Sequence, residues 1–254
     1  MPIVRAFIQQ QDRRKLRHEE QLVVEELERR GIPIFFYTVK QILRRQLPLD
    51  RQSLVVGDLD CIRGALHQLD IPLPLLNEYP GSLATLLHRR IWRSTLGNLE
   101  RSLVAGMTRS IFAKPANRCK RFTGFVLHDE GDLYRVGNVS RQEQIFCAEV
   151  VSWLSEYRIY VVNSEIRSVD FYSGNPDILI DLNIIKNAID ILDRSGESYA
   201  GYAIDFGVLS SGETALIEMN DGFAIGAYQI NAQDYTDLIL SRWEELRSST
   251  DRAY

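Results

Sequence analysis

Cysteine is scarce in this chain of 254 residues, and its scarcity excludes two kinds of site. The three cysteines, Cys61, Cys119 and Cys147, are odd in number and far apart. They therefore predict neither a disulfide framework nor a Cys-x-x-Cys metal site. Reduced thiols are typical of the cytoplasm, which is where we expect the protein to work.

Long apolar runs and an excess of positive charge are also lacking. No segment reaches the roughly 18 consecutive apolar residues of a membrane-spanning helix, and the N-terminus lacks the apolar core of a secretion signal. We therefore expect no membrane partner and no export. The net charge of -4 argues against binding nucleic acid by bulk electrostatics. With 45% hydrophobic residues, the chain can bury a substantial core.

The first 80 residues alternate short apolar runs with amphipathic stretches. Strands are expected in IVRAFI, IPIFFY and SLVVG, and helices are expected at 14–30, 39–46 and 58–69. This alternation predicts a small parallel sheet of the Rossmann-like type. Because no GxGxxG motif is present, we predict no dinucleotide site there. The lobe is either a scaffold or part of an acceptor-binding site.

The pattern changes after the proline-rich connector IPLPLLNEYPG. Helical spacing is expected at 82–104, and from Ile111 onward most segments read as short strands and hairpins. Two further helices are expected at 181–193 and 234–246. The fold class is thus α/β followed by α+β, with an N-terminal lobe at 1–80 and a second domain at 81–254.

Residues 202–220, YAIDFGVLSSGETALIEMN, predict an antiparallel hairpin with a two-residue turn at Ser211 and Gly212. In that register Asp205 lies opposite Glu218, and Asn220 shares the face of Glu218. Like charges so placed destabilise a sheet, so a shared proton, a basic side chain or a divalent cation must compensate. These oxygen donors suit Mg²⁺ or Mn²⁺. A partly exposed polar strand is the alternative.

Two lysines occur in FAKPANRCKRFTG. Lys114 is expected at the end of a strand, and Lys120 in a loop that ends in Thr123 and Gly124. A strand lysine can hold a phosphate as a point charge, and a glycine-containing loop can close over it with backbone N–H groups. Taken singly, each lysine means little, and a solvated surface charge is the alternative.

Acidic and basic residues also flank the segment CAEVVSWLSEYR. The backbone of an apolar linker at Glu149, Val150 and Val151 can form hydrogen bonds with the edge of adenine. Glu156 can accept hydrogen bonds from ribose hydroxyls. Arg158 shares the strand face of Glu156 and can neutralise a phosphate or carboxylate. An ordinary Glu–Arg surface pair is the alternative.

The order of these elements resembles the ATP-grasp superfamily, and the spacing Asp-x12-Glu-x-Asn is its most specific part. The triplets EYR at 156–158 and FTG at 122–124 resemble, more particularly, a divergent clade marked by one Arg and two Lys. That clade is found in bacterial and phage gene clusters. It is related to a eukaryotic factor that assists assembly of a translation initiation complex.

The resemblance implies a fold and a set of site residues. It implies a Rossmann-like lobe preceding an ATP-grasp fold, in which two α+β subdomains with antiparallel sheets hold ATP between them, with a hinge near 145–152. The assigned metal ligands are Asp205, Glu218 and Asn220; the phosphate contacts are Lys114, Lys120, Thr123, Gly124 and Arg158; the adenine and ribose contacts are Glu149, Val150, Val151 and Glu156. Asp221, which directly follows Asn220, is a weaker candidate for a substrate or metal contact.

The activity implied is ATP- and magnesium-dependent ligation of a carboxylate to an amine through an acyl phosphate, with a peptide or protein among the candidate substrates. Lys114, Lys120 and Arg158 would be its catalytic cations. An ATP-binding assembly factor without turnover, a phosphotransferase, and a carboxylate-rich hairpin that binds no nucleotide are the alternatives.

Overall fold

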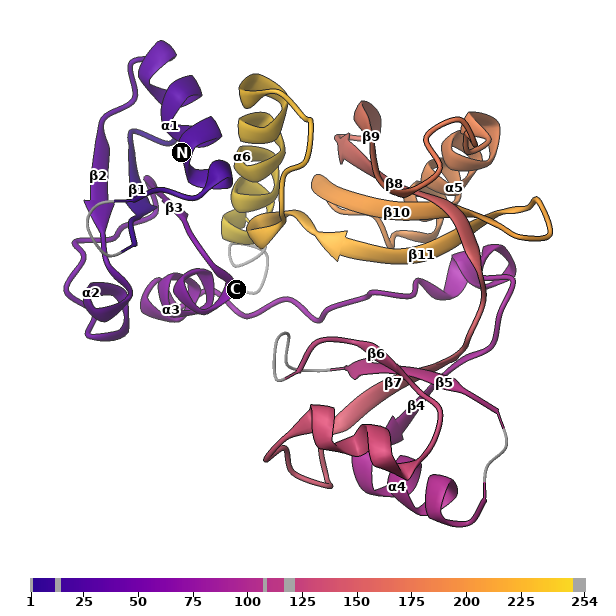
Figure 1. Ribbon diagram of the computed structural model, residues 1–254. Coiled ribbons are helices and arrows are strands. Elements are labelled where there is room, and N and C mark those ends of the chain that lie inside the picture. Colours follow the sequence, from indigo (N-terminus) through magenta and orange to yellow (C-terminus); the bar gives the residue numbers. More distant parts are fainter. Residues whose placement is uncertain (1, 12–14, 107–108, 117–121, 249–254) are drawn as a thin grey trace.

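The computed structural model describes residues 2–11, 15–106, 109–116 and 122–248, which form three sheets (Figure 1). A parallel sheet lies at the N-terminal end of the molecule, and two four-stranded antiparallel sheets lie beside and below it. No helix within the described ranges combines the length and apolarity that crossing a bilayer requires.

The N-terminal sheet is parallel in the order β2-β1-β3, which confirms the predicted alternation of strand and helix. Its strands are β1 (Arg5–Gln9), β2 (Ile34–Tyr37) and β3 (Ser53–Val56), and its helices are α1 (His18–Arg29), α2 (Val39–Leu43) and α3 (Leu59–Gln68). Asp58 caps α3 by accepting a hydrogen bond from the Cys61 backbone N–H. The carboxyl ends of β1 and β3 thus lead into polar residues at one edge of the sheet.

A second sheet has the antiparallel order β11-β10-β8-β9. It consists of β8 (Trp153–Val162), β9 (Glu165–Gly174), β10 (Gly201–Leu209) and β11 (Thr214–Asp221), and it packs against α5 (Leu182–Ser195) and α6 (Ala232–Ser248). The helix α6 also packs on the N-terminal sheet, where the Trp243 indole N–H donates to the Ser53 carbonyl at 2.9 Å. One hydrophobic core therefore joins these two sheets.

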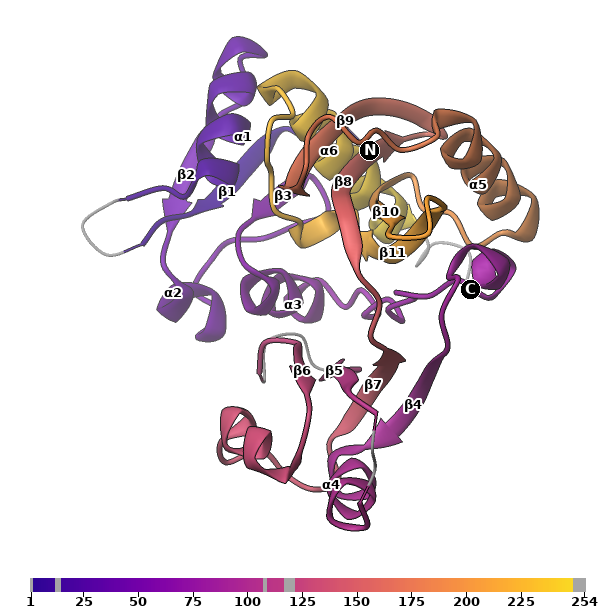
Figure 2. The same cartoon turned by 45° about the vertical axis from the view of Figure 1, so that its right-hand side comes forward.

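The third sheet, with the antiparallel order β4-β7-β5-β6, has a core of its own. It contains β4 (Ile91–Thr95), β5 (Ile111–Pro115), β6 (Phe125–Leu127) and β7 (Gln144–Glu149), together with α4 (Leu96–Val104) and the 3-10 helix η3 (Glu130–Val136). Both views place it below the strands β10 and β11 (Figures 1 and 2). Two antiparallel sheets facing one another are what the family resemblance implied.

Two sequence predictions in this region are wrong. The segment 82–104 is not one helix, because the β-branched and aromatic stretch IWRST forms β4 between the 3-10 helix η2 (Gly81–Leu86) and α4. Thr95 ends that strand and caps α4 through the Asn98 backbone N–H. The segment GFVLHDEGDLYRV at 124–136, which the sequence pattern placed among the strands and hairpins after Ile111, is a strand only over β6, because Asp129 caps η3.

The chain passes between the two antiparallel sheets at two adjacent places. The backbone N–H of Arg90 donates to the Glu149 carboxylate at 3.0 Å, and the Glu149 N–H donates to the Arg90 carbonyl at 3.0 Å. The link 150–152 falls inside the stretch predicted as a hinge. The division of the chain at residue 80 stays a prediction.

Candidate functional site

The β10–β11 hairpin places Asp205 directly opposite Glu218, as its sequence predicts. The turn itself differs from the prediction, because Val208 pairs with Thr214 and the Leu209 N–H donates to the Glu213 carbonyl. That longer turn shifts the register by one residue. A bulge at Ile217 shifts it back, since Phe206 pairs with Leu216 while Asp205 pairs with Glu218.

Arg89 supports the bulge from the connection that leads to β4. Its guanidinium donates to the carbonyls of Leu216 at 2.7 Å and Ile217 at 2.9 Å. On the same edge of β11, the Met219 N–H donates to the Glu78 carbonyl at 2.9 Å. The strand that carries the carboxylates is therefore held by the residues that precede β4.

Each of the two opposed carboxylates has its own cation. Asp205 is 2% exposed and accepts hydrogen bonds from Arg158 Nε at 2.8 Å and Nη2 at 2.7 Å. Burial raises the pKa of Asp205 to about 6, although Arg158 opposes the shift. Burial would likewise raise the pKa of Glu218, but Lys114 outweighs it and lowers that pKa. Of the compensations considered from the sequence, the structure shows basic side chains.

Lys114 occupies the centre of the site. Its ammonium group forms ion pairs with both Glu78 and Glu218, and it lies 4.7 Å from the ring centroid of Tyr79. Burial alone would lower the pKa of Lys114, yet Glu218 and the other acidic neighbours raise it. Glu78 was not among the predicted site residues, although it is the only acid in the connector IPLPLLNEYPG.

Arg158 and Glu156 project from the same side of β8, as their spacing predicts. Arg158 lies 5.0 Å from the ring centroid of Tyr228, and Tyr228 stacks on Tyr172 at 5.1 Å. The Tyr172 hydroxyl donates to Glu156 Oε2 at 3.2 Å. An aromatic pair therefore connects the two charged residues beside the Arg158–Asp205 ion pair.

The remaining residues predicted to contact the nucleotide lie on or next to the third sheet. Glu149 and Val150 are exposed and Val151 is half-buried in the link between β7 and β8. Thr123 is exposed, and Gly124 packs so closely on Phe112 that a Cβ atom would collide with the ring. Lys120 and Cys119 lie outside the described residues.

A cavity of about 300 Å³ opens between β5, β11 and the connector before η2. It brings together Lys114, Gly124, Glu218 and Asn220 from the predicted set, and it also contains Glu78. Asp205, Arg158 and Glu156 do not line it. The rest of its wall is largely apolar and consists of Leu59, Leu76, Pro115, Phe122, Tyr199, Met219, Phe223 and Ala224 with Asn77 and Asp221.

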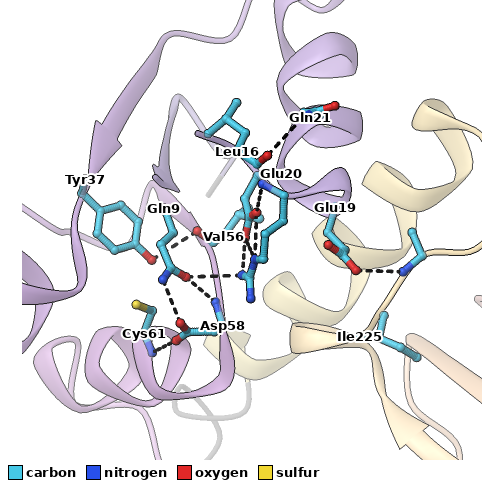
Figure 3. Close-up of polar contacts among 12 residues, drawn as sticks. Gln9, Leu16, Glu19, Glu20, Gln21, Tyr37, Val56, Asp58, Cys61 and Ile225 are labelled. Carbon is cyan, nitrogen blue, oxygen red and sulfur yellow. Dashed lines mark hydrogen bonds and ion pairs between the residues drawn. The ribbon is translucent and has the colours of Figure 1, made fainter. Parts of the chain in front are cut away.

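A second cavity, of about 130 Å³, lies on the other side of Leu59, Phe223 and Ala224, which line both cavities. The N-terminal lobe supplies its polar wall, in which Arg17 Nε donates to both Glu20 oxygens at 3.0 Å. Asp58 also lines this cavity and accepts a hydrogen bond from Gln9 at 2.7 Å (Figure 3). The N-terminal lobe thus reaches the immediate neighbourhood of the site.

Asp221 is fully engaged in a structural contact. Its two oxygens accept hydrogen bonds from Arg242 Nε at 2.6 Å and Nη2 at 2.5 Å, and its side chain is 3% exposed. It also caps the short 3-10 helix η4 (Gly222–Ala224). The side chain therefore fastens the end of β11 to α6.

The oxygen donors of the hairpin fit magnesium in their chemistry. Asn220 Nδ2 donates to Glu218 Oε1 at 3.1 Å, so the amide and the carboxylate are close enough to share one ion. Among the described residues, no group of three or more His, Cys, Asp or Glu side chains could hold a metal. A magnesium ion here needs Asn220 and further oxygens from water or a bound phosphate.

A family model for an ATP-grasp domain, the second family of the clade named for one Arg and two Lys, matches residues 86–238, more than half of the chain. The match covers the third sheet, the second sheet and most of the residues discussed above. A search of curated proteins finds no match.

Solved structures share the fold at low sequence identity. An ATP-grasp RimK domain protein from Sphaerobacter thermophilus is 15% identical with a TM-score of 0.57, over 92% of this chain and 99% of that one. D-alanine–D-alanine ligase from Bacillus anthracis, complexed with ATP, is 11% identical with a TM-score of 0.57, over 97% and 99%. The ATP-grasp ligase PsnB, complexed with a minimal precursor, is 13% identical with a TM-score of 0.51, over 98% and 99%.

Proposed function

Because this chain belongs to that ATP-grasp family, the second of the clade with one Arg and two Lys, we propose that it joins a carboxylate to an amine on a peptide or protein. Membership makes the chain an ATP-grasp ligase, an enzyme that uses ATP and magnesium. The observation that carries the proposal is the position of Lys114, which lies between two carboxylates in a cavity between the two antiparallel sheets.

The nucleotide would lie along the cleft between these sheets. We assign adenine to the link at 149–151, the ribose to Glu156, and the phosphates to Lys114, Lys120, Arg158 and the backbone at Thr123 and Gly124. Glu218 and Asn220 would hold magnesium, and Asp205 would join them when Arg158 moves from its two oxygens to a phosphate; the ion would supply neutralising charge there. Lys114 can exchange its ion pair with Glu218 for a phosphate oxygen, because Glu78 keeps it in place.

The reaction needs no protein nucleophile. The acceptor carboxylate takes the γ-phosphoryl group from ATP, ADP leaves, and the acyl phosphate is then attacked by the amine with release of phosphate. The side chains act by position and charge, since the developing negative charge forms beside cations that are already oriented. Leu59, Phe122 and Phe223 line the same cavity and would exclude water from the acyl phosphate.

The N-terminal lobe would contact the acceptor. This interpretation is supported by Leu59, which lines both cavities, and by the polar wall that Arg17 and Asp58 add to the smaller one. A peptide acceptor is consistent with the fold shared with PsnB, whose solved structure contains a precursor.

Trapping of the acyl phosphate tests the proposal. The full-length protein is incubated with Mg-ATP, a peptide pool from a cell lysate and hydroxylamine, and peptide hydroxamates are identified by mass spectrometry. We expect hydroxamates that require both ATP and magnesium. If Mg-ATP stabilises the protein but no hydroxamate forms, the result would contradict the ligase and favour an ATP-binding assembly factor. If phosphopeptides form without hydroxamate, the result would favour a phosphotransferase.

The control variants address the metal site. Glu218→Gln combined with Asn220→Ala should abolish both the hydroxamates and the stabilisation by Mg-ATP, which is about 2.7 kcal/mol at 100 times the dissociation constant. Glu213→Gln is the matched control, because Glu213 is exposed at the turn of the same hairpin. Unchanged Mg-ATP binding in the double variant would contradict the assignment.

A further inference from the structure

The outer edge of the N-terminal sheet is open. β2 is a terminal strand in the order β2-β1-β3, and within the part of the chain that the structure describes no strand pairs with its outer side. Both views show it at the periphery of the molecule, with α2 at its carboxyl end (Figures 1 and 2). An open edge presents unpaired backbone N–H and C=O groups that can pair with another extended chain.

Large apolar side chains are exposed along this edge. Phe35 is 49% exposed and Phe36 is 48% exposed, although they point to opposite faces of the sheet. In α2, Val39 is 36% exposed and Leu43 is 64% exposed, and their spacing places them on one side of the helix. We call these four residues and the intervening backbone the β2–α2 surface.

The charge of this surface is opposite to that of the whole protein. Residues 31–49 contain Lys40, Arg44 and Arg45 but no Asp or Glu, whereas the chain has a net charge of -4. Within the described residues, Lys40 and Arg44 form no ion pair. Arg45 contacts the ring of His67 at 2.9 Å. A partner with acidic side chains would therefore be attracted to it.

Apart from its length of four residues, β2 lacks the devices that prevent strand pairing. Edge strands that resist pairing often carry charged residues or proline within the strand. β2 has the sequence IFFY, which contains neither, and Pro33 lies just before the strand. In an antiparallel pairing of two copies through this edge, the α2 helices would lie at opposite ends of the paired strands, and residues 31–49 of either copy offer no acid to Lys40 and Arg44 of the other. A dimer would therefore leave these charges unmatched. The chemistry favours a different, acidic chain.

We propose that the β2–α2 surface binds an extended acidic segment of a partner protein, which adds to the sheet as a strand beside β2. Backbone hydrogen bonds along β2 supply register, Phe35 and Phe36 receive apolar side chains, and Lys40 and Arg44 pair with the acids. This inference does not depend on the proposed ligase activity. It gives the N-terminal lobe a role as the site that recruits a protein.

Three synthetic peptides of eight residues test the inference. One alternates Glu with Val, one alternates Lys with Val, and one is the Glu peptide with proline at two central positions, which removes backbone donors. Binding to the full-length protein is measured by fluorescence anisotropy, and protection of the amides of 34–37 by hydrogen exchange. We expect binding and protection with the first peptide alone, weakening as salt increases.

Variants of the protein complete the test. Lys40→Glu with Arg44→Glu should weaken binding at least about tenfold, whereas Lys186→Glu on the exposed side of α5 should leave it unchanged. Equal binding of the Lys peptide or the proline peptide would overturn the inference. So would dimerisation of the free protein that protects 34–37, because it would identify a second copy as the occupant.

Discussion

Asp205 and Glu218 face one another across the β10–β11 ladder, yet the two carboxylates contact different cations. Arg158 on the neighbouring strand β8 binds Asp205, whereas Lys114 from the other antiparallel sheet binds Glu218. One ion pair therefore lies within a sheet and the other joins two sheets. Loss of the Arg158–Asp205 pair should reduce stability as well as ligand binding, whereas loss of the Lys114–Glu218 pair should mainly affect ligand binding.

The Arg158–Asp205 pair should be strongly coupled. Asp205→Asn or Arg158→Met leaves a buried charge without its partner, and we expect each to cost about 3 to 5 kcal/mol in free energy of unfolding. The double variant should cost much less than the sum of the two. Urea denaturation of all four proteins measures the coupling, and additive losses would show that the pair does not act as a unit.

Lys114→Met should weaken Mg-ATP binding. The loss of a charged hydrogen bond to phosphate is worth about 1.5 to 3 kcal/mol, or roughly tenfold to a hundredfold in Kd. Isothermal titration calorimetry measures the change, and Lys186→Met on α5 is the matched control for loss of a positive charge. An unaltered Kd in Lys114→Met would remove this lysine from the phosphate site.

Insertion of one alanine after Ile217 should move the site residues to the wrong face. The bulge accommodates one extra residue between Leu216, which pairs with Phe206, and Glu218, which pairs with Asp205; a second extra residue shifts Glu218 and Asn220 by one position, which reverses every side chain beyond it. We expect loss of Mg-ATP stabilisation in a thermal unfolding assay.

Insertion of one glycine after Ser211 is the matched control, since it lengthens the exposed turn without changing the pairing of Asp205 with Glu218. Equal Mg-ATP responses in the two insertion variants would argue that the register beyond the bulge has no part in the site.

Glu197 should make stability depend on pH. Burial raises its pKa, but hydrogen bonds from Ser82, Asn77 and the Gly81 backbone outweigh burial and lower the pKa to about 2. Because the folded pKa is below the unfolded value of about 4.3, this stabilisation is present above that value and is lost as the pH falls toward 2.

Glu197→Gln should therefore unfold at a lower temperature than the native protein at pH 7, with a difference that narrows between about pH 5 and pH 2. Calorimetric scans across this range measure the difference. A difference that stays constant with pH would mean that the carboxylate charge does not hold η2 in place.

Local patterns were enough to predict much of the hairpin and of the N-terminal sheet. Alternation of side chains along a strand placed Glu218 and Asn220 on one face. Alternation of strand and helix predicted that β1, β2 and β3 form a parallel sheet. The pairing of Asp205 with Glu218 was predicted from a two-residue turn that does not exist. The prediction held because the longer turn and the bulge at Ile217 displace the register in opposite directions.

The sequence by itself determined the strands and the acidic and basic residues that they carry, because side-chain periodicity depends only on neighbours along the chain. Only the tertiary structure decided which charges meet. Glu78 lies 36 residues before Lys114 and 140 before Glu218 in the chain, and their contact depends on how the connector packs between two sheets. Such packing arises from contacts distant in sequence, which no local pattern records.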